Sequence, residues 1–463
     1  MSEKISKKLL CQNKNGYDRI SEAERNEMNA YCEEYKEFLA KGCTERECVD
    51  ETIRLARERG YRELKRGEKL QPGDKVYRVE AGKAIALAVI GRKSLEQGVV
   101  ISGAHIDNPR LDLKPNPLYE DAGEVARFKT HYYGGIRKYQ WVSIPLALHG
   151  VVCLKDGATV QVRLGDEPGD PQFTIPDLLP HLADKQAKEP LWQAIKGEDL
   201  NVLVGSEPYP DSEEKERFKL QVMVLLHEKY GITEEDFNSA ELCVAPAFRP
   251  ADIGFDRSMI GAYGQDDRVC SFASLKGLFD AENTLKRTGI CLLVDKEEIG
   301  SYGITGMDSS FFDRFLSDLC RSQGADYDTC IENSFCLSCD VTAAYDDNFA
   351  YAYEKRNNAP WNGGVSLCKY TGARGKSGAS DASAELMAFA RKVLDGDGVL
   401  WTVGEMGRID VGGGGTIAHY MARRGIPTLD AGTPLLAMHA PFEVSAKLDC
   451  YMTYRAARAF YNN

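Results

Sequence analysis

The chain has 463 residues, with 58 lysines and arginines against 70 aspartates and glutamates and a formal net charge of -12. This length exceeds one ordinary core, so we expect at least two domains and enough buried surface for a large enzyme. The acidic balance, without a basic run interleaved with aromatic residues, argues against a nucleic-acid partner.

Neither end of the chain nor its interior shows a membrane signal. The N-terminus carries lysines but no apolar core of a signal peptide, and no apolar run approaches the roughly 20 residues that span a bilayer. We therefore expect a cytoplasmic protein without membrane contact. The 14 cysteines are irregularly spaced, which indicates reduced, mostly buried thiols. Packing is also favoured over zinc binding for the single C-x-x-C, Cys336 and Cys339.

Two helices are expected in the first 70 residues. Ser21 with Glu24 and Thr44 with Glu47 form capping boxes, and Gly60 is placed where the second helix should end. The first helix has an apolar stripe of Met28, Tyr31, Tyr35, Phe38 and Leu39.

A sheet is expected to begin at Lys75. Residues 75–91 and 98–105 are rich in valine, isoleucine and alanine and bounded by glycines, which is typical of parallel strands covered on both faces. Between about Asp112 and Pro250 the character changes to proline-rich and charge-rich stretches that separate short strand-like runs. This segment therefore indicates an inserted, β-rich second domain.

Helix-like and strand-like patterns alternate again from Gly261 to the end of the chain. They cover helices at 270–287, 382–394 and 414–425 and strands at 289–301, 334–345, 399–406 and 426–432. The alternation predicts an α/β fold, a doubly wound mixed sheet with helices on both faces. We expect a discontinuous catalytic domain of residues 1–111 and 251–463 and an inserted domain of residues 112–250.

Five segments place acidic or imidazole side chains just after predicted strands, where open α/β sheets bind ligands. They are GAHID, GQDDR, DKEEIGS, SCDVT and LLAMHAP. For each segment taken alone, an ordinary structural role is about as good an explanation as a functional one.

In the first two segments, His105 ends an apolar strand and Asp107 is a candidate partner for its second ring nitrogen. A hydrogen-bonded structural histidine is the alternative. Asp266 and Asp267 are adjacent carboxylates, which raise each other's pKa in a buried site unless a cation is present. A solvated turn in which an aspartate caps a helix is an equal alternative.

In the other three segments, Glu297 and Glu298 follow the apolar run CLLV at a strand end. One of them can bind a metal ion while its neighbour accepts a proton from an activated water. Asp340 follows another strand, where a buried carboxylate needs a cation or several donors. His439 follows an apolar segment near the end of the chain and, by itself, is an ordinary core histidine.

The five segments, in this order and over nearly the whole chain, resemble the aspartyl aminopeptidase / aminopeptidase I family of dinuclear zinc peptidases. The resemblance implies an α/β peptidase and two divalent metal ions per subunit, zinc first, with cobalt and manganese as alternatives. By motif, it implies that His105, Asp266 and Asp340 hold one ion and that Asp266, Glu298 and His439 hold the other. Asp266 is preferred to Asp267 as the residue that bridges the two ions, because it lies six residues before Phe272, as in the family. Asp107 would orient His105, and Glu297 would be the general base.

The same resemblance implies that residues 112–250 form a dimerisation domain and that the subunits assemble into homo-oligomers, as tetrahedral dodecamers. Within that domain, TIPDLLPHL resembles a segment whose histidine reaches the active site of the partner subunit, which indicates His181 as a further catalytic residue. The expected substrates are peptides. Arg374 and Lys376 are out of register with the lysine that selects acidic residues in the family, so both acidic and neutral N-terminal residues stay open.

Two other functions compete with an aminopeptidase. A deacylase or amidohydrolase of small N-acyl compounds on a related fold would use a similar dinuclear site. A catalytically silent scaffold would keep the fold, but the complete set of candidate ligands argues against this alternative.

Overall fold

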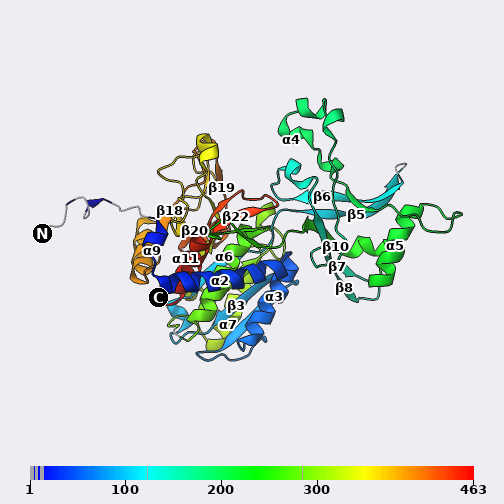
Figure 1. The fold of residues 1–463 in the computed structure, drawn as a ribbon. Coiled ribbons are helices and arrows are strands. Elements are labelled where there is room, and N and C mark those ends of the chain that lie inside the picture. Colours follow the sequence, from blue (N-terminus) through cyan, green and yellow to red (C-terminus); the bar gives the residue numbers. More distant parts are fainter. Residues whose placement is uncertain (1–4, 6–8, 11–14, 122–123, 284) are drawn as a thin grey trace.

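A nine-stranded mixed sheet forms the centre of the computed structural model, which describes residues 5, 9–10, 15–121, 124–283 and 285–463 (Figure 1). Its strand order is β1-β2-β3-β13-β4-β14-β20-β16-β18. The strands are β1 Arg62–Glu63, β2 Lys75–Glu80, β3 Ala84–Val89, β4 Val100–His105, β13 Gly289–Val294, β14 Phe335–Cys339, β16 Val365–Cys368, β18 Trp401–Val403 and β20 Thr428–Gly432. Strands β13, β4, β14 and β20 are neighbours and run parallel.

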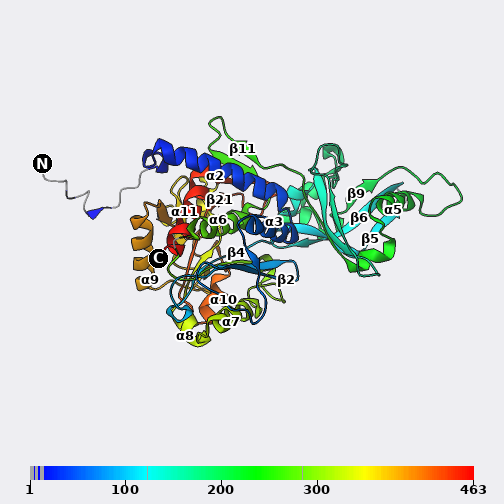
Figure 2. The same ribbon diagram turned by 90° about the horizontal axis from the view of Figure 1, so that it is seen from below.

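Helices cover both faces of this sheet. Successive side chains of a strand point to opposite faces, so each strand contributes apolar side chains to two separate cores. On β3, Ile85 and Leu87 pack in one core cluster while Ala84 and Ala86 pack in another. The first face carries α2 Glu22–Lys41, α3 Glu45–Glu58, α6 Gln265–Ala281, α9 Ala384–Gly396 and α11 Lys447–Tyr461, and the second carries α7 Phe311–Gln323, α8 Tyr327–Glu332 and α10 Ala418–Arg423. Figure 2 shows the two layers on either side of β4. The expected doubly wound α/β fold is confirmed.

The expectation that the parallel core begins at Lys75 is wrong. Strands β2 and β3 form an antiparallel hairpin, and β3 also runs antiparallel to β13. Ala81 and Gly82 both have positive φ in the short connection, so the chain turns back immediately instead of crossing over. The bounds of the predicted helices also differ: α6 spans Gln265–Ala281 instead of 270–287, α9 spans Ala384–Gly396 instead of 382–394, and α10 spans Ala418–Arg423 instead of 414–425.

The N-terminal helices follow the sequence closely. Both capping boxes form, at Ser21 with Glu24 and at Thr44 with Glu47, and the five apolar side chains of the predicted stripe are buried. The described part of the chain contains 13 free cysteines, most of them buried, as expected. None of the described helices is long and apolar enough to cross a bilayer.

Residues 110–246 leave the central sheet and form a six-stranded antiparallel sheet of their own, hereafter the inserted segment (Figure 1). Its order is β8-β7-β10-β5-β6-β9, with β5 Arg110–Asp121, β6 Val125–Tyr133, β7 Leu146–Cys153, β8 Thr159–Leu164, β9 Val202–Gly205 and β10 Ala240–Pro246. Helices α4 Leu191–Ala194 and α5 Arg217–Tyr230 belong to it. The segment buries a separate apolar cluster that includes Phe128, Trp141 and Leu200.

A smaller five-stranded sheet pairs β12, which precedes α6, with β22, which precedes the C-terminal helix α11. Its order is β11-β12-β22-β21-β15, with β11 Ala251–Ile253, β12 Met259–Ala262, β15 Thr342–Ala343, β21 Pro434–Leu436 and β22 Glu443–Ala446. Strand β17 Gly372–Ala373 pairs with β19 Gly413–Gly414 in a separate ribbon. The turns of the five-stranded sheet carry several of the acidic and imidazole side chains described next.

Candidate metal centre

The ends of three neighbouring parallel strands meet the start of α6 and the β21–β22 turn. His105 is the last residue of β4 and is paired with Val294, the last residue of β13. Glu297 and Glu298 follow β13 in a 3-10 helix, and Asp340 follows β14. Because parallel strands place their carboxyl ends at one edge of a sheet, residues far apart in the sequence converge there.

Asp266 lies between two histidines. His105 Nε2 is 3.2 Å from Asp266 Oδ1, and His439 Nε2 is 3.1 Å from Asp266 Oδ2. His439 Nε2 is also 3.5 Å from Glu298 Oε1. Ligand atoms of His105, Asp266 and Glu298 therefore lie within 4.8 Å of one another, as do those of His105, Glu297 and Asp340.

Asp267 occupies a different position from Asp266. It groups with Asp266 and Asp340, and neither of its carboxylate oxygens has a hydrogen-bond partner among the described residues. Its side chain is completely buried, and this burial raises the pKa of Asp267 well above its usual value. Only Asp266, of the two adjacent aspartates, lies in direct contact with both histidines.

Both histidines present the same ring nitrogen to this cluster. His105 Nδ1 is 2.9 Å from the carbonyl oxygen of Asp107, and His439 Nδ1 is 2.8 Å from the carbonyl oxygen of Gly135. A carbonyl oxygen only accepts hydrogen bonds, so in a neutral imidazole Nδ1 carries the proton. Nε2 of each ring then holds a free lone pair directed at Asp266, which is the arrangement of a metal-binding histidine.

The carboxylates of this cluster fit a bound cation. Asp266 Oδ1, Glu298 Oε1 and both oxygens of Asp267 are buried without hydrogen-bond partners among the described residues. Burial, together with the charge of Asp266, raises the pKa of Glu298 well above its usual value. Unpaired buried charges are costly, whereas carboxylate oxygens and imidazole nitrogens are suitable ligands for zinc, cobalt or manganese. The donor set thus fits divalent metal ions.

Asp107 holds two parts of the site together. It accepts hydrogen bonds from the backbone N–H groups of Glu297 and Glu298 at 3.1 Å and 3.2 Å. Its Oδ1 is 3.3 Å from His105 Nδ1, and Tyr133 donates its hydroxyl to Oδ2 at 2.7 Å. The aspartate therefore fixes both the imidazole and the turn that presents the two glutamates.

The pKa of Glu297 is shifted toward neutrality in the metal-free chain. Burial raises its pKa to about 7, and the negative charges of Asp107 and Asp266 act in the same direction, while the two histidines oppose it. A group with this pKa both accepts and releases a proton near neutrality.

Two contributions to the site were missed from the sequence. Glu443, on β22, accepts hydrogen bonds from the backbone N–H groups of Gln265, Asp266 and His439, at 2.6 Å, 3.2 Å and 2.7 Å. Burial raises its pKa to about 8. The sequence offered one signal for Glu443, a charged residue in an apolar segment four residues after His439.

The other missed contribution comes from the inserted segment. Tyr133, the last residue of β6, contacts Asp107, and Gly135, two residues further on, contacts His439. No local pattern marks them, because their role depends on how the inserted segment lies against the central sheet.

His181 is the one predicted site residue that lies outside this cluster. It is exposed on a short 3-10 helix, Pro180–Leu182, of the inserted segment. Cys336 and Cys339 are buried on β14, and Cys339 lies 3.4 Å from the Ser102 hydroxyl, so packing explains them.

The family model described as "Aminopeptidase I zinc metalloprotease (M18)" matches residues 38–461. The chain belongs to the M18 family of aminopeptidases. It is therefore a metallo-aminopeptidase, a hydrolase that removes N-terminal residues from peptides. The expected family is confirmed, and the deacylase alternative is not favoured.

Several relatives cover nearly the whole chain. The chain is 47% identical over 464 residues to a "Probable M18 family aminopeptidase 1" of Clostridium acetobutylicum, covering 98% of this chain and 99% of that protein. A protein of the same description from Thermotoga maritima is 47% identical over 94% of this chain and 96% of its own length. A crystal structure of a T. maritima M18 aminopeptidase superposes with a TM-score of 0.93 at 44% identity, covering 97% of this chain and 99% of that one.

Proposed function

We propose that this M18 aminopeptidase holds two zinc ions in the cluster around Asp266. His105, Asp266 and Asp340 hold one ion, and Asp266, Glu298 and His439 hold the other. The observation that carries this proposal is the position of Asp266, with one carboxylate oxygen toward each histidine. Sharing a carboxylate between two ions offsets the unpaired negative charge that the cluster otherwise buries.

Two bound divalent ions would polarise the scissile carbonyl and lower the pKa of the attacking water. Glu297 takes the proton of that water and transfers it to the amine of the departing peptide. Asp107 holds His105 and the backbone of Glu297 in place through its hydrogen bonds. Tyr133 keeps the aspartate oriented from the inserted segment.

Peptides with free and acetylated N-termini test this function. We expect the zinc-loaded protein to release the first residue from the free peptide, with the acetylated peptide cleaved at least about a hundredfold more slowly. Mass spectrometry of the products measures both rates. Preferential removal of the acetyl group would instead identify a deacylase.

We also propose that the chain forms homo-oligomers through its inserted segment, built from dimers and completed as a tetrahedral dodecamer. Exposed apolar side chains lie near His181 in the sequence of the inserted segment: Leu178, Leu179, Leu182 and Trp192 are 46%, 48%, 66% and 70% exposed. An apolar surface of this kind is typical of a protein interface. A structure titled as a Saccharomyces cerevisiae mApe1 dodecamer shares the fold, at a TM-score of 0.75 and 20% identity.

In such a dimer, His181 would reach the metal cluster of the partner subunit. We expect His181→Ala to reduce the rate about a hundredfold, as the loss of one donor to the reacting oxygen does in other hydrolases. His227→Ala, which removes another exposed histidine of the inserted segment, is the matched control and should retain activity.

Mixing two inactive variants tests the contact between subunits. Co-assembly of His181→Ala and Glu297→Gln chains should restore about a quarter of the activity, since half of randomly formed dimers pair the two variants and each such pair has one complete site. Absence of any recovery in verified mixed oligomers would show that His181 does not act across the interface.

A further inference from the structure

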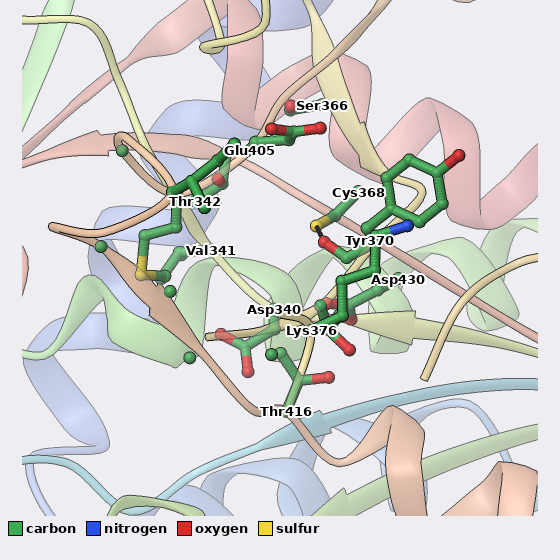
Figure 3. A pocket seen from close by; sticks show the side chains of 18 of the residues that line it. Asp340, Val341, Thr342, Ser366, Cys368, Tyr370, Lys376, Glu405, Thr416 and Asp430 are labelled. Atoms are coloured by element: carbon green, nitrogen blue, oxygen red, sulfur yellow. Dashed lines mark hydrogen bonds between the residues drawn. The ribbon is translucent and has the colours of Figure 1, made fainter. Parts of the chain in front are cut away.

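A cavity of about 320 Å³ lies between α2 and the inserted segment, apart from the metal cluster. It shares no lining residue with the cavity that adjoins the proposed metal ligand Asp340 (Figure 3). Cys43, in the connection between α2 and α3, and His149, on β7, line it from its two sides. The cavity therefore presents a thiol and an imidazole that the aminopeptidase site does not use.

Cys43 is held at the junction of two helices. Gly42 caps the end of α2, and Thr44 begins the capping box of α3, so Cys43 alone lies between the two caps. Its carbonyl oxygen accepts a hydrogen bond from Arg268 Nη2 at 2.6 Å. The residue is partly exposed, whereas most of the other described cysteines are buried. A fixed backbone and partial exposure suit a site-specific thiol reaction.

His149 and Glu47 form a pair beside this thiol. The Sγ of Cys43, a ring nitrogen of His149 and a carboxylate oxygen of Glu47 lie within 4.8 Å of one another. His149 Nδ1 is 3.0 Å from Glu47 Oε1, and Glu47 Oε2 accepts the backbone N–H of Thr44 at 3.0 Å. Glu47 is thus fixed by the helix cap and orients the imidazole. A nucleophile next to a base, with a third group that orients the base, is the arrangement that activates a cysteine.

The strand pattern explains why His149 faces Cys43. Leu148 packs in the apolar cluster of the inserted segment, and successive side chains of β7 point to opposite faces. His149 therefore points toward α3, where it is buried. Burial favours the neutral ring, but the Cys43 thiol and the Glu47 carboxylate outweigh it and raise the pKa of His149 well above its usual value. The imidazole is consequently suited to take the proton of the thiol.

Arg268 brings a positive charge without a counter-charge to the same cavity. Its side chain is completely buried, and its Nε and Nη1 have no hydrogen-bond partner among the described residues. The guanidinium carbon lies 5.5 Å from the centre of the Tyr263 ring, which offers no strong acceptor. No carboxylate of the described chain forms an ion pair with Arg268. An unpaired buried charge is costly, so this guanidinium favours an anion in the cavity.

The other basic side chains of the lining are already paired. Three ion pairs account for them, at 2.8 Å, 2.7 Å and 2.9 Å: Lys36 with Asp252, Arg163 with Asp166, and Arg249 with Glu167. Two further acids of the lining, Glu33 and Glu37, are exposed on α2. A metal ion on Cys43, Glu47 and His149 is the alternative, but it would place a cation beside the guanidinium groups of Arg163 and Arg268.

We infer that Cys43 is a modification site that forms mixed disulfides with small disulfides whose halves carry carboxylates. The Cys43 thiolate attacks one sulfur of the reagent, the sulfur–sulfur bond of the reagent breaks, and a bond between Cys43 and that sulfur forms. The other half leaves as a thiolate and takes the proton that His149 accepted from the thiol. The carboxylate of the attached half meets Arg268. Excess small thiol reverses the exchange.

Cys153 provides a comparison within the same chain, because it is exposed on β7 and its sulfur lies 3.7 Å from the Thr159 hydroxyl instead of beside an imidazole. In the zinc-loaded protein near neutral pH, the anionic disulfide 5,5′-dithiobis(2-nitrobenzoate) should modify Cys43 at least about tenfold faster than Cys153. Peptide mass spectrometry at successive times assigns each modified thiol.

A reagent of opposite charge tests the role of the unpaired guanidinium. With cystamine, a cationic disulfide, the preference for Cys43 over Cys153 should fall by at least about tenfold, because the cavity attracts an anion and not a cation. The ratio of two thiols in one chain cancels the intrinsic reactivity of each reagent. It also requires no substitution, so the stability of a variant does not affect it.

His149→Gln should slow the modification of Cys43 by about tenfold and leave that of Cys153 unchanged, since glutamine can bond to Glu47 but cannot take the thiol proton. Equal rates at Cys43 and Cys153, or the same preference for both reagents, would overturn the inference. A third zinc ion per chain that is lost in Cys43→Ser would also overturn it, because the three side chains would then hold a metal. These results do not depend on peptide cleavage, so the proposed aminopeptidase is tested separately.

Discussion

Glu297→Gln is expected to reduce kcat/KM for peptides by about two to four orders of magnitude, the usual contribution of a general base. Glutamine preserves the shape of the side chain but cannot accept the proton of the attacking water. Burial raises the pKa of Glu297 to about 7 in the metal-free chain, whereas a glutamine amide at this position has no basic group near neutral pH. Steady-state kinetics on a zinc-loaded variant measure the effect.

The neighbouring glutamate provides the comparison for this variant. Glu297→Gln should retain its bound zinc, since Glu297 is not one of the proposed ligands, whereas Glu298→Gln should lose zinc as well as activity. Metal content by elemental analysis distinguishes the two. A Glu297→Gln variant that keeps more than about a tenth of the wild-type rate would exclude Glu297 as the base.

Removal of the metal ions with a chelator is expected to abolish activity and to lower the unfolding temperature by several degrees near pH 8. Without a cation, burial raises the pKa of Glu297 to about 7 and that of Glu443 to about 8, from 4.5. Each folded carboxyl group then binds more protons than its unfolded counterpart between these values. The stability of the stripped chain should therefore fall as the pH rises from about 4.5 to about 8.

The zinc-loaded chain should lose much less stability over the same interval, because the ions compensate the carboxylates. Thermal unfolding of both forms at several pH values measures the difference, which should grow with pH. A stripped chain that becomes more stable as the pH rises, or that remains fully active, would contradict the proposed metal cluster.

The sequence predicts much of this site because of where the residues lie relative to the strands. His105, Glu297, Glu298 and Asp340 follow buried apolar runs, and the carboxyl ends of neighbouring parallel strands meet at one edge. The central sheet is predictable for the same reason, since long apolar runs alternate with helical patterns. The β2–β3 hairpin is the exception, because Ala81 and Gly82 reverse the chain where a crossover was expected.

The remaining parts of the site depend on contacts between distant segments. Tyr133 reaches Asp107 only because the inserted segment lies against the central sheet, and no spacing in the sequence encodes that contact. Glu443 acts by accepting backbone hydrogen bonds, a role with no residue motif. The role of His181 is expected only from the resemblance of TIPDLLPHL to a family segment, because residue spacing within one chain does not encode a contact with another copy.

The account is tested most directly by adding zinc in known amounts to the chelator-stripped protein and measuring release of the N-terminal residue from an aspartate peptide and a leucine peptide. We predict that activity depends on added zinc and reaches its maximum at two equivalents per chain. Full activity without zinc, or a maximum at one equivalent, would contradict the dinuclear site bridged by Asp266.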